Sequence, residues 1–148
     1  MKIGIGSDEK TLLTDHVLKE IRDMGHEIVL YGPLQGDSLP WPLVSEQLAR
    51  DVAAGKVHEG ILFCYTGTGS SIAANKVPGI RAALCGDAQT ARGARWWNDA
   101  NILVMSLRAT STEVAGEILE AWFSESVKDG EEKFVQMVAE IEARNRLL

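Results

Sequence analysis

The stretch GILFCYTGTGSSIAAN, residues 60–75, decides the fold. Its first part is an apolar run of strand length that ends at Cys64, and its last part has the composition of a short helix. Gly67 and Gly69 mark a tight turn between the two. Strands that are apolar nearly throughout are typical of a parallel sheet covered on both faces. The stretch therefore predicts a strand, a turn and a helix within an α/β protein.

The rest of the chain repeats this alternation of strand and helix. Predicted strands occupy residues 2–7, 27–31, 60–65, 80–85 and 101–106, and predicted helices occupy residues 11–24, 43–54, 88–97, 112–125 and 131–146. Thr110 with Glu113 matches a capping box at the start of one helix. Residues 32–42 form the one long irregular connection, and Trp41 within it is a candidate to line a site. Right-handed crossovers between such strands predict a parallel sheet with ligands beyond its carboxyl edge.

Composition limits the class of protein. The chain has 148 residues, which suits one domain, and a net charge of −6 that argues against nucleic acid or an anionic membrane as partner. Cys64 and Cys85 form neither a metal-ligand spacing nor a disulfide framework, so a reducing cytoplasm is expected. No apolar stretch approaches the roughly 18 residues that span a bilayer. We expect neither export nor membrane insertion.

The turn TGTGSS, residues 66–71, has three interpretations. A dinucleotide fingerprint needs a third glycine where this chain has Ile72, and a P-loop needs a Gly-Lys-Ser/Thr sequence that is absent. The third interpretation is an anion site, in which backbone N–H groups at a helix start face the ligand and only small side chains stand nearby. This interpretation accounts for every residue of the turn.

Cys64 comes just before the turn, and two readings of it stay open. A thiol beside several N–H donors is shifted toward thiolate, which acts as a base or a nucleophile. Alternatively, Cys64 is a small apolar side chain that fills the end of a central strand. Elsewhere, Asp87 is expected to cap the helix that begins at Ala88, and Cys85 is expected to lie in the core.

Four segments carry a family resemblance: KIGIGSD at residues 2–8, GILFCYTGTG at 60–69, SIAANKVPGIRAALCGD at 71–87 and TARGARWWNDANILVMS at 90–106. Together they resemble the family of ribose-5-phosphate isomerase B and the galactose-6-phosphate isomerase subunits. The resemblance implies a Rossmann-like three-layer α/β sandwich of one domain, residues 1–148, with a five-stranded parallel sheet. It also implies a C-terminal helix at about residues 131–146 that packs on a partner subunit.

The resemblance further implies a cytoplasmic homodimer or homotetramer with a shared active site, no metal and no organic cofactor. The reaction is interconversion of an aldose and a ketose. By resemblance, Cys64 moves a proton between C1 and C2, Thr66 and the backbone of residues 67–70 hold the enediolate, and Asp8 contacts sugar hydroxyls. By the same resemblance, Asn98 is expected to come from the neighbouring subunit. The complete set of candidate substrate-binding residues is Asp8, Glu9, Tyr65, Gly67, Thr68, Gly69, Ser70, Trp97, Asn98 and Arg108.

Several departures from the family pattern concern the substrate. Glu9 stands where the family has a histidine that helps to hold phosphate, and Glu131 and Val135 stand where it has two arginines spaced four residues apart. Trp97 replaces the ring-opening histidine and cannot carry a proton at neutral pH. Tyr65 adds bulk where the family has glycine. Arg108, at another phosphate-facing position, is retained.

These residues predict a ketol isomerase whose substrate choice is altered from ribose 5-phosphate. Its substrate is either a ketotetrose phosphate, which cannot close a furanose ring, or an unphosphorylated sugar stacked on Trp96 or Trp97. A noncatalytic subunit or sugar-binding regulator is the alternative, although retention of Cys64 and Thr66 argues against it. A small nucleotide-binding module, supported only by the fold and Asp87, is a third hypothesis.

Overall fold

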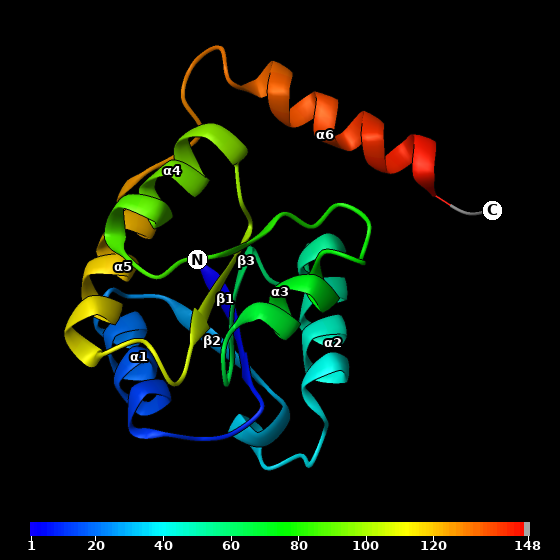
Figure 1. Ribbon diagram of the computed structural model, residues 1–148. Helices are drawn as coiled ribbons and strands as arrows, with labels where there is room; N and C mark the ends of the chain where they lie inside the picture. Colours follow the sequence, from blue (N-terminus) through cyan, green and yellow to red (C-terminus); the bar gives the residue numbers. More distant parts are fainter. Residues whose placement is uncertain (147–148) are drawn as a thin grey trace.

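Five parallel strands form one sheet in the computed structural model, which describes residues 1–146 (Figure 1). Their spatial order is β2-β1-β3-β5-β4. The strands are β1 (Lys2–Ser7), β2 (Glu27–Tyr31), β3 (Glu59–Cys64), β4 (Ala82–Leu84) and β5 (Ile102–Ser106). The predicted number and direction of strands are confirmed. Every strand consequently ends at the same edge of the sheet.

Helices cover both faces of the sheet. They are α1 (Leu12–Asp23), η1 (Gly32–Gln35, a 3-10 turn), α2 (Trp41–Ala53), α3 (Thr68–Ala74), α4 (Ala88–Asn98), α5 (Thr112–Ser124) and α6 (Glu132–Asn145). Helices α1, α4 and α5 share one buried cluster with the sheet, and α2 and α3 share the other. Figure 1 shows these two groups on opposite sides of the strands. The predicted three-layer α/β architecture is confirmed.

Side chains of the central strand alternate between the two clusters. Ile61 and Phe63 of β3 pack with α1 and α5, whereas Leu62 packs on the α2 side. Gly60 lets α2 approach closely, because a Cβ atom there would lie 2.4 Å from Cδ2 of Leu48. Burial on both faces explains why β3 is apolar nearly throughout.

Two local predictions are wrong in detail. The N-cap of α5 is Ser111, whose hydroxyl accepts from the amide of Val114 at 3.1 Å, and Thr110 with Glu113 is not the capping pair. The connection at residues 32–42 is irregular only over 36–40, because η1 occupies its start and α2 begins at Trp41. The expected cap at Asp87 is confirmed by its carboxylate, which accepts from the amide of Thr90 at 2.7 Å.

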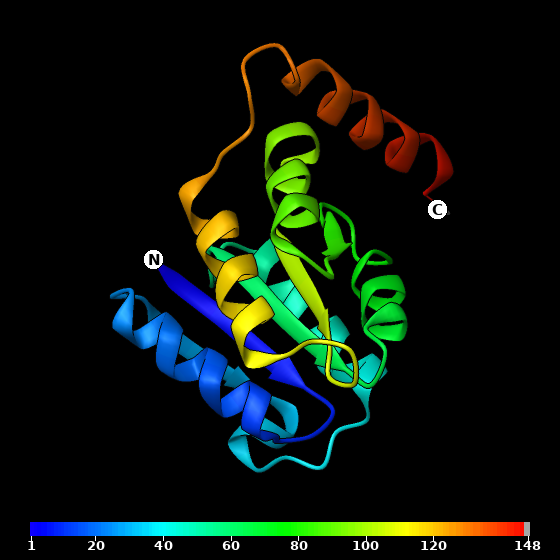
Figure 2. The same ribbon diagram turned by 60° about the vertical axis from the view of Figure 1, so that its left-hand side comes forward.

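The last helix, α6, stands apart from the layers (Figure 2). None of its residues is buried, and about half of the surface of four apolar side chains is exposed: Phe134, Met137, Val138 and Ile141. Glu142 fastens it to the body, because its carboxylate accepts from the amide of Gly79 at 3.1 and 3.2 Å. Within residues 1–146, no helix combines the length and the apolar character needed to cross a membrane.

Candidate active site

The carboxyl ends of β1, β3 and β5 lie side by side at the middle of the sheet. Ser7 is paired with Phe63, and Cys64 is paired with Ser106. Residues that directly follow β1 and β3 therefore share one edge, and these include Asp8 and Thr66. The three-strand edge is the place where a parallel sheet is expected to bind a ligand.

Cys64 is the last residue of β3 and is 5% exposed. The chain after β5 holds the exit of this strand in place. The amide of Leu107 donates to the carbonyl oxygen of Cys64 at 3.0 Å, and the hydroxyl of Ser106 donates to the carbonyl of Tyr65 at 3.0 Å. The position of the sulfur is thus set by two neighbouring strands rather than by a free loop.

The turn after Cys64 depends on glycine. Gly67 has a φ of 83°, and a Cβ atom there would lie 2.5 Å from Cδ1 of Leu84 and 3.3 Å from the carbonyl carbon of Met105. Both the left-handed backbone and the close approach exclude a larger residue. The turn brings the chain from the end of β3 directly into α3.

The first amides of α3 have no protein acceptor. Within residues 1–146, the backbone N–H groups of Thr68, Gly69 and Ser70 make no hydrogen bond, and the first bond of the helix runs from Ser71 to Gly67 at 3.2 Å. The hydroxyls of Thr66 and Thr68 are hydrogen-bonded to each other at 2.8 Å, so one of them donates to the other and the second is a further donor beside these amides. The structure thus places a group of unused donors next to the end of β3.

Trp41 lies against the same turn. A Cβ atom built on Gly69 would lie 2.9 Å from two carbons of the indole six-membered ring. The sequence indicated Trp41 only through its place in the long connection, and the contact arises because α2 packs beside α3. The indole ring of Trp41 therefore borders the amides of residues 68–70.

Asp8 faces this edge with an unsatisfied acceptor. Its Oδ1 atom is buried and has no hydrogen-bond partner within the described part of the chain. Burial, and then the charge of Glu9, raise the pKa of the Asp8 carboxyl, while the backbone amides of Asp8, Tyr65 and Glu9 act in the opposite direction. A hydroxyl of a ligand would donate to this buried acceptor and so give it a hydrogen-bond partner.

Tyr65 and Arg108 mark the outer side of the edge. Tyr65 is 62% exposed, and the guanidinium carbon of Arg108 lies 5.8 Å from the centre of its ring. Glu9 is also exposed, with its backbone tied to the hydroxyl of Ser7. The cationic side chain of Arg108 and the two acidic side chains of the predicted set, Asp8 and Glu9, thus lie at the same edge as Cys64.

Trp97 and Asn98 lie at the opposite edge of the sheet from Cys64. They end α4, four residues before β5 begins, and β5 runs for five residues before it reaches the level of Cys64. The four steps from Ile102 to Ser106, at about 3.3 Å each, alone separate the two sites by about 13 Å. A single chain therefore does not bring Asn98 to Cys64.

Five cavities in the described part of the chain also lie near Trp97 and Asn98 or elsewhere on the surface, and not at Cys64. A cavity of about 310 Å³ lies between β4, α4 and α6 and is lined in part by Arg81, Trp97, Asn98 and Phe134. Cys64 lines none of these five cavities, which were found between residues 1 and 146. The edge at Cys64 is open in one chain.

Comparison with known proteins places the chain among sugar isomerases. The model of the family described as Ribose/Galactose Isomerase matches residues 3–141. Ribose-5-phosphate isomerase B of Escherichia coli is 34% identical over 97% of each chain, and D-erythrulose-4-phosphate isomerase of Pectobacterium atrosepticum is 35% identical over 88% of this chain and 87% of its own. The structure of Clostridium thermocellum ribose-5-phosphate isomerase B superposes with a TM-score of 0.92 at 36% identity, covering 99% of this chain and all of the other.

Proposed function

Because the chain belongs to the Ribose/Galactose Isomerase family and is an aldose–ketose isomerase, we propose that it isomerises a short, open-chain sugar phosphate through proton transfer by Cys64. The single observation that carries the proposal is the group of unused amides at residues 68–70, directly beyond the strand that ends in Cys64. A base and an anion-binding group side by side are the two requirements of this reaction.

The proposed step is a proton relay between neighbouring carbons. The Cys64 thiolate removes a proton from the carbon next to the carbonyl, and the electron pair moves onto the carbonyl oxygen to give an enediolate. The thiol then returns a proton to the former carbonyl carbon, while a proton passes from one oxygen to the other. No atom is gained or lost, so the reaction needs no further reagent.

The amides stabilise the charge that forms in this step. The N–H groups of Thr68, Gly69 and Ser70 would donate to the enediolate oxygens, with the hydroxyl of Thr66 beside them. Donors that are already oriented can each contribute about 3–4 kcal/mol to such an oxyanion. Asp8 would accept from a sugar hydroxyl through its unsatisfied Oδ1 and so set the orientation of the substrate.

Side chains assigned to the shared site support a short substrate. Trp97 has no group that could protonate a ring oxygen, and a four-carbon ketose phosphate cannot form a furanose ring. The similarity to a relative named D-erythrulose-4-phosphate isomerase supports the same substrate class. Arg108 would meet the phosphate at the outer side of the edge, with Tyr65 narrowing the pocket.

We further propose that two copies of the chain build each site. Asn98 and Trp97 lie far from Cys64 in one chain, and the apolar face of α6 is uncovered. Ile72 and Leu84, beside the turn, are exposed as well. A second copy that packs on these surfaces would cover them and deliver Asn98 to the open edge at Cys64.

The proposal is tested by following hydrogen exchange and turnover with erythrulose 4-phosphate, ribose 5-phosphate and free pentoses. We expect turnover to be fastest with erythrulose 4-phosphate, and Cys64→Ala to lose both turnover and deuterium uptake from solvent into the sugar. Cys85→Ala is the matched control, because Cys85 is the other free, buried cysteine and belongs to the core cluster on the α1 side of the sheet. Unchanged turnover in Cys64→Ala would remove Cys64 as the base, and a preference for ribose 5-phosphate would remove the assigned substrate.

A further inference from the structure

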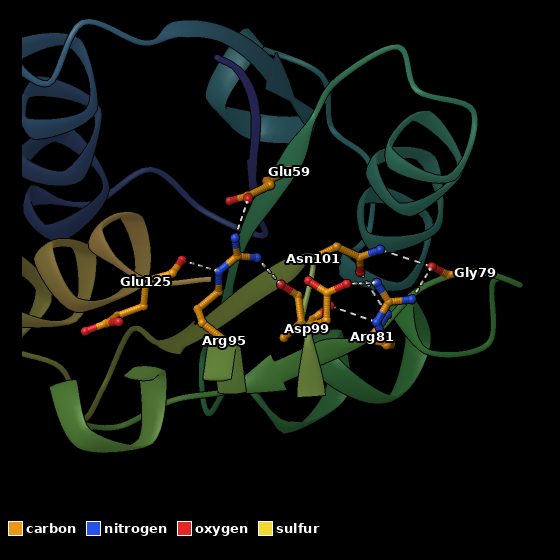
Figure 3. A network of polar contacts seen from close by, with 8 residues as sticks. Glu59, Gly79, Arg81, Arg95, Asp99, Asn101 and Glu125 are labelled. Carbon is orange, nitrogen blue, oxygen red and sulfur yellow. Dashed lines mark hydrogen bonds and ion pairs between the residues drawn. The ribbon is translucent and has the colours of Figure 1, made fainter. Parts of the chain in front are cut away.

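We propose that Arg81 and Arg95 clamp the backbone of residues 99–101 and thereby position Asn98, the residue just before them, for the site of a second copy. Figure 3 shows this network, with Arg81 and Arg95 on the two sides of the connection between α4 and β5. The inference rests on the proposed shared site, because only there does the position of Asn98 affect catalysis.

The connection contains an unusual backbone conformation. Asp99 has a φ of 45°, and it is the one non-glycine residue with a positive φ within the part of the chain that the structure describes. A side chain in this region costs free energy, and it persists where surrounding contacts hold it. The contacts around Asp99 are therefore the place to look for what fixes this turn.

Arg81 holds the turn from the side of β4. Its Nε donates to the carbonyl oxygen of Asp99 at 2.8 Å, and its terminal nitrogen lies 3.5 Å from the carboxylate of the same residue. The backbone amide of Arg81 also donates to Oδ1 of Asn101 at 2.8 Å, and the side-chain amide of Asn101 donates to the carbonyl of Gly79 at 3.0 Å. One guanidinium thus contacts both the backbone and the side chain of Asp99.

Arg95 holds the turn from the other side. Its Nη1 donates to the carbonyl oxygen of Ala100 at 2.6 Å, and its Nε donates to the carbonyl of Glu125 at 3.3 Å. The side chain is itself fixed, because it is 13% exposed and pairs with Glu59 at 3.1 Å. Glu59 is held in turn by the indole N–H of Trp122 at 2.7 Å. The clamp is thereby anchored in the core.

The side chains that precede the clamped residues are exposed. Trp97 is 49% exposed, and Asn98 is exposed and makes no side-chain hydrogen bond with any residue from 1 to 146. A backbone held by two arginines next to an unengaged amide is the arrangement expected of a residue that must meet a ligand at a set position. Holding Asn98 still before the substrate arrives reduces the entropy lost on binding.

The proposed clamp depends on the guanidinium group of arginine, which is planar and carries several N–H donors in fixed directions. Lysine at position 81 would keep the positive charge near the Asp99 carboxylate, but it has a single nitrogen and cannot also reach the Asp99 carbonyl in the same geometry. Arg81→Lys therefore loosens the turn without removing the charge. Arg50→Lys is the matched control, since Arg50 is exposed and pairs, among residues 1–146, with Glu46 alone, on its own helix at 2.7 Å.

A double-mutant cycle tests whether Arg81 acts through Asn98. We expect Arg81→Lys to lower kcat/KM at least ~10-fold in the wild-type background and less than ~2-fold in the Asn98→Ala background, because a displaced turn has no further effect once the amide is gone. Asp99→Gly, which tolerates the positive φ but removes the carboxylate, serves as the second variant if Arg81→Lys does not fold. Wild-type kinetics in Arg81→Lys, or the same loss in both backgrounds, would overturn the inference.

Amide hydrogen exchange tests the clamp without reference to turnover. Arg81→Lys should speed exchange at residues 98–101, where the amide of Asn101 donates to the Arg81 carbonyl at 3.0 Å, and leave residues 66–71 unchanged. Unchanged exchange at 98–101 would refute the clamp even in an active enzyme. If Arg81→Lys accelerates this exchange but the wild-type enzyme isomerises no sugar phosphate, the clamp stands, the proposed function is refuted and Asn98 is left without the assigned role.

Discussion

The ring of Trp41 lies on the backbone of Gly69, so close that a Cβ atom at residue 69 would be 2.9 Å from two ring carbons. This contact joins the first residue of α2 to the second residue of α3, and it borders the amides that we assign to the enediolate. Any change at Gly69 must therefore move either the indole or the donors.

We predict that Gly69→Ala lowers kcat/KM while costing about 1–3 kcal/mol of stability, because the added methyl group overpacks the contact with Trp41. Steady-state kinetics and urea unfolding measure the two effects. Gly86→Ala is the control, since a Cβ atom at Gly86 meets nothing within 4 Å and its φ is not positive. Wild-type kinetics in a folded Gly69→Ala variant would show that the turn does not hold the reacting oxygens.

We predict that Asp8→Asn raises stability at neutral pH and impairs turnover. Burial raises the pKa of Asp8 above its ordinary value of 3.8, so folding favours the protonated form and the carboxylate destabilises the folded state. The stability gain of Asp8→Asn should therefore appear as pH rises through the raised pKa and vanish at acid pH, where the carboxyl is protonated in both states. Thermal unfolding from pH 3 to pH 8 measures it, and a gain that is largest at acid pH would contradict the assigned direction.

We predict that Cys64→Ala chains, which are inactive, and Asn98→Ala chains, which are strongly impaired, restore activity when their subunits are mixed. In a heterodimer of Cys64→Ala and Asn98→Ala chains, one site carries both changes and the other carries neither. Random reassortment then gives about a quarter of the wild-type rate, because half of the dimers are mixed and each has one intact site. The measurement is turnover after denaturation and joint refolding. Absence of recovery in dimers shown to be mixed would place both residues in the same chain's site.

We predict that Trp97→His shifts the substrate preference toward ribose 5-phosphate. An imidazole at this exposed position supplies a group that titrates near neutral pH and can protonate a ring oxygen. The ratio of kcat/KM for ribose 5-phosphate to that for erythrulose 4-phosphate should rise about 10-fold or more. Trp97→Phe is the control for loss of the indole alone. An equal rise in Trp97→Phe would show that bulk, rather than a missing acid, sets the preference.

Local patterns in the sequence predicted the parts of the fold that depend on neighbouring residues. Apolar runs located the strands within one or two residues at most ends, and Asp87 was identified as a helix cap. The cap of α5 was misplaced by one residue, because Thr110 and Ser111 carry equivalent hydroxyls and only the observed backbone separates them. The predicted partner contact of the helix at residues 131–146 remains a proposal.

The candidate site also has a part that the local sequence predicts and a part that only the packing of elements shows. The sequence by itself determined that Cys64, Thr66 and a glycine turn follow one buried strand, because strand, turn and helix propensities act over a few residues. Only the tertiary structure decided that Trp41 borders Gly69, that Asn98 lies at the opposite edge from Cys64, and that Arg81 and Arg95 meet around Asp99. Those relationships join residues from different elements, and they follow from how helices and strands pack, which no local pattern of residues encodes.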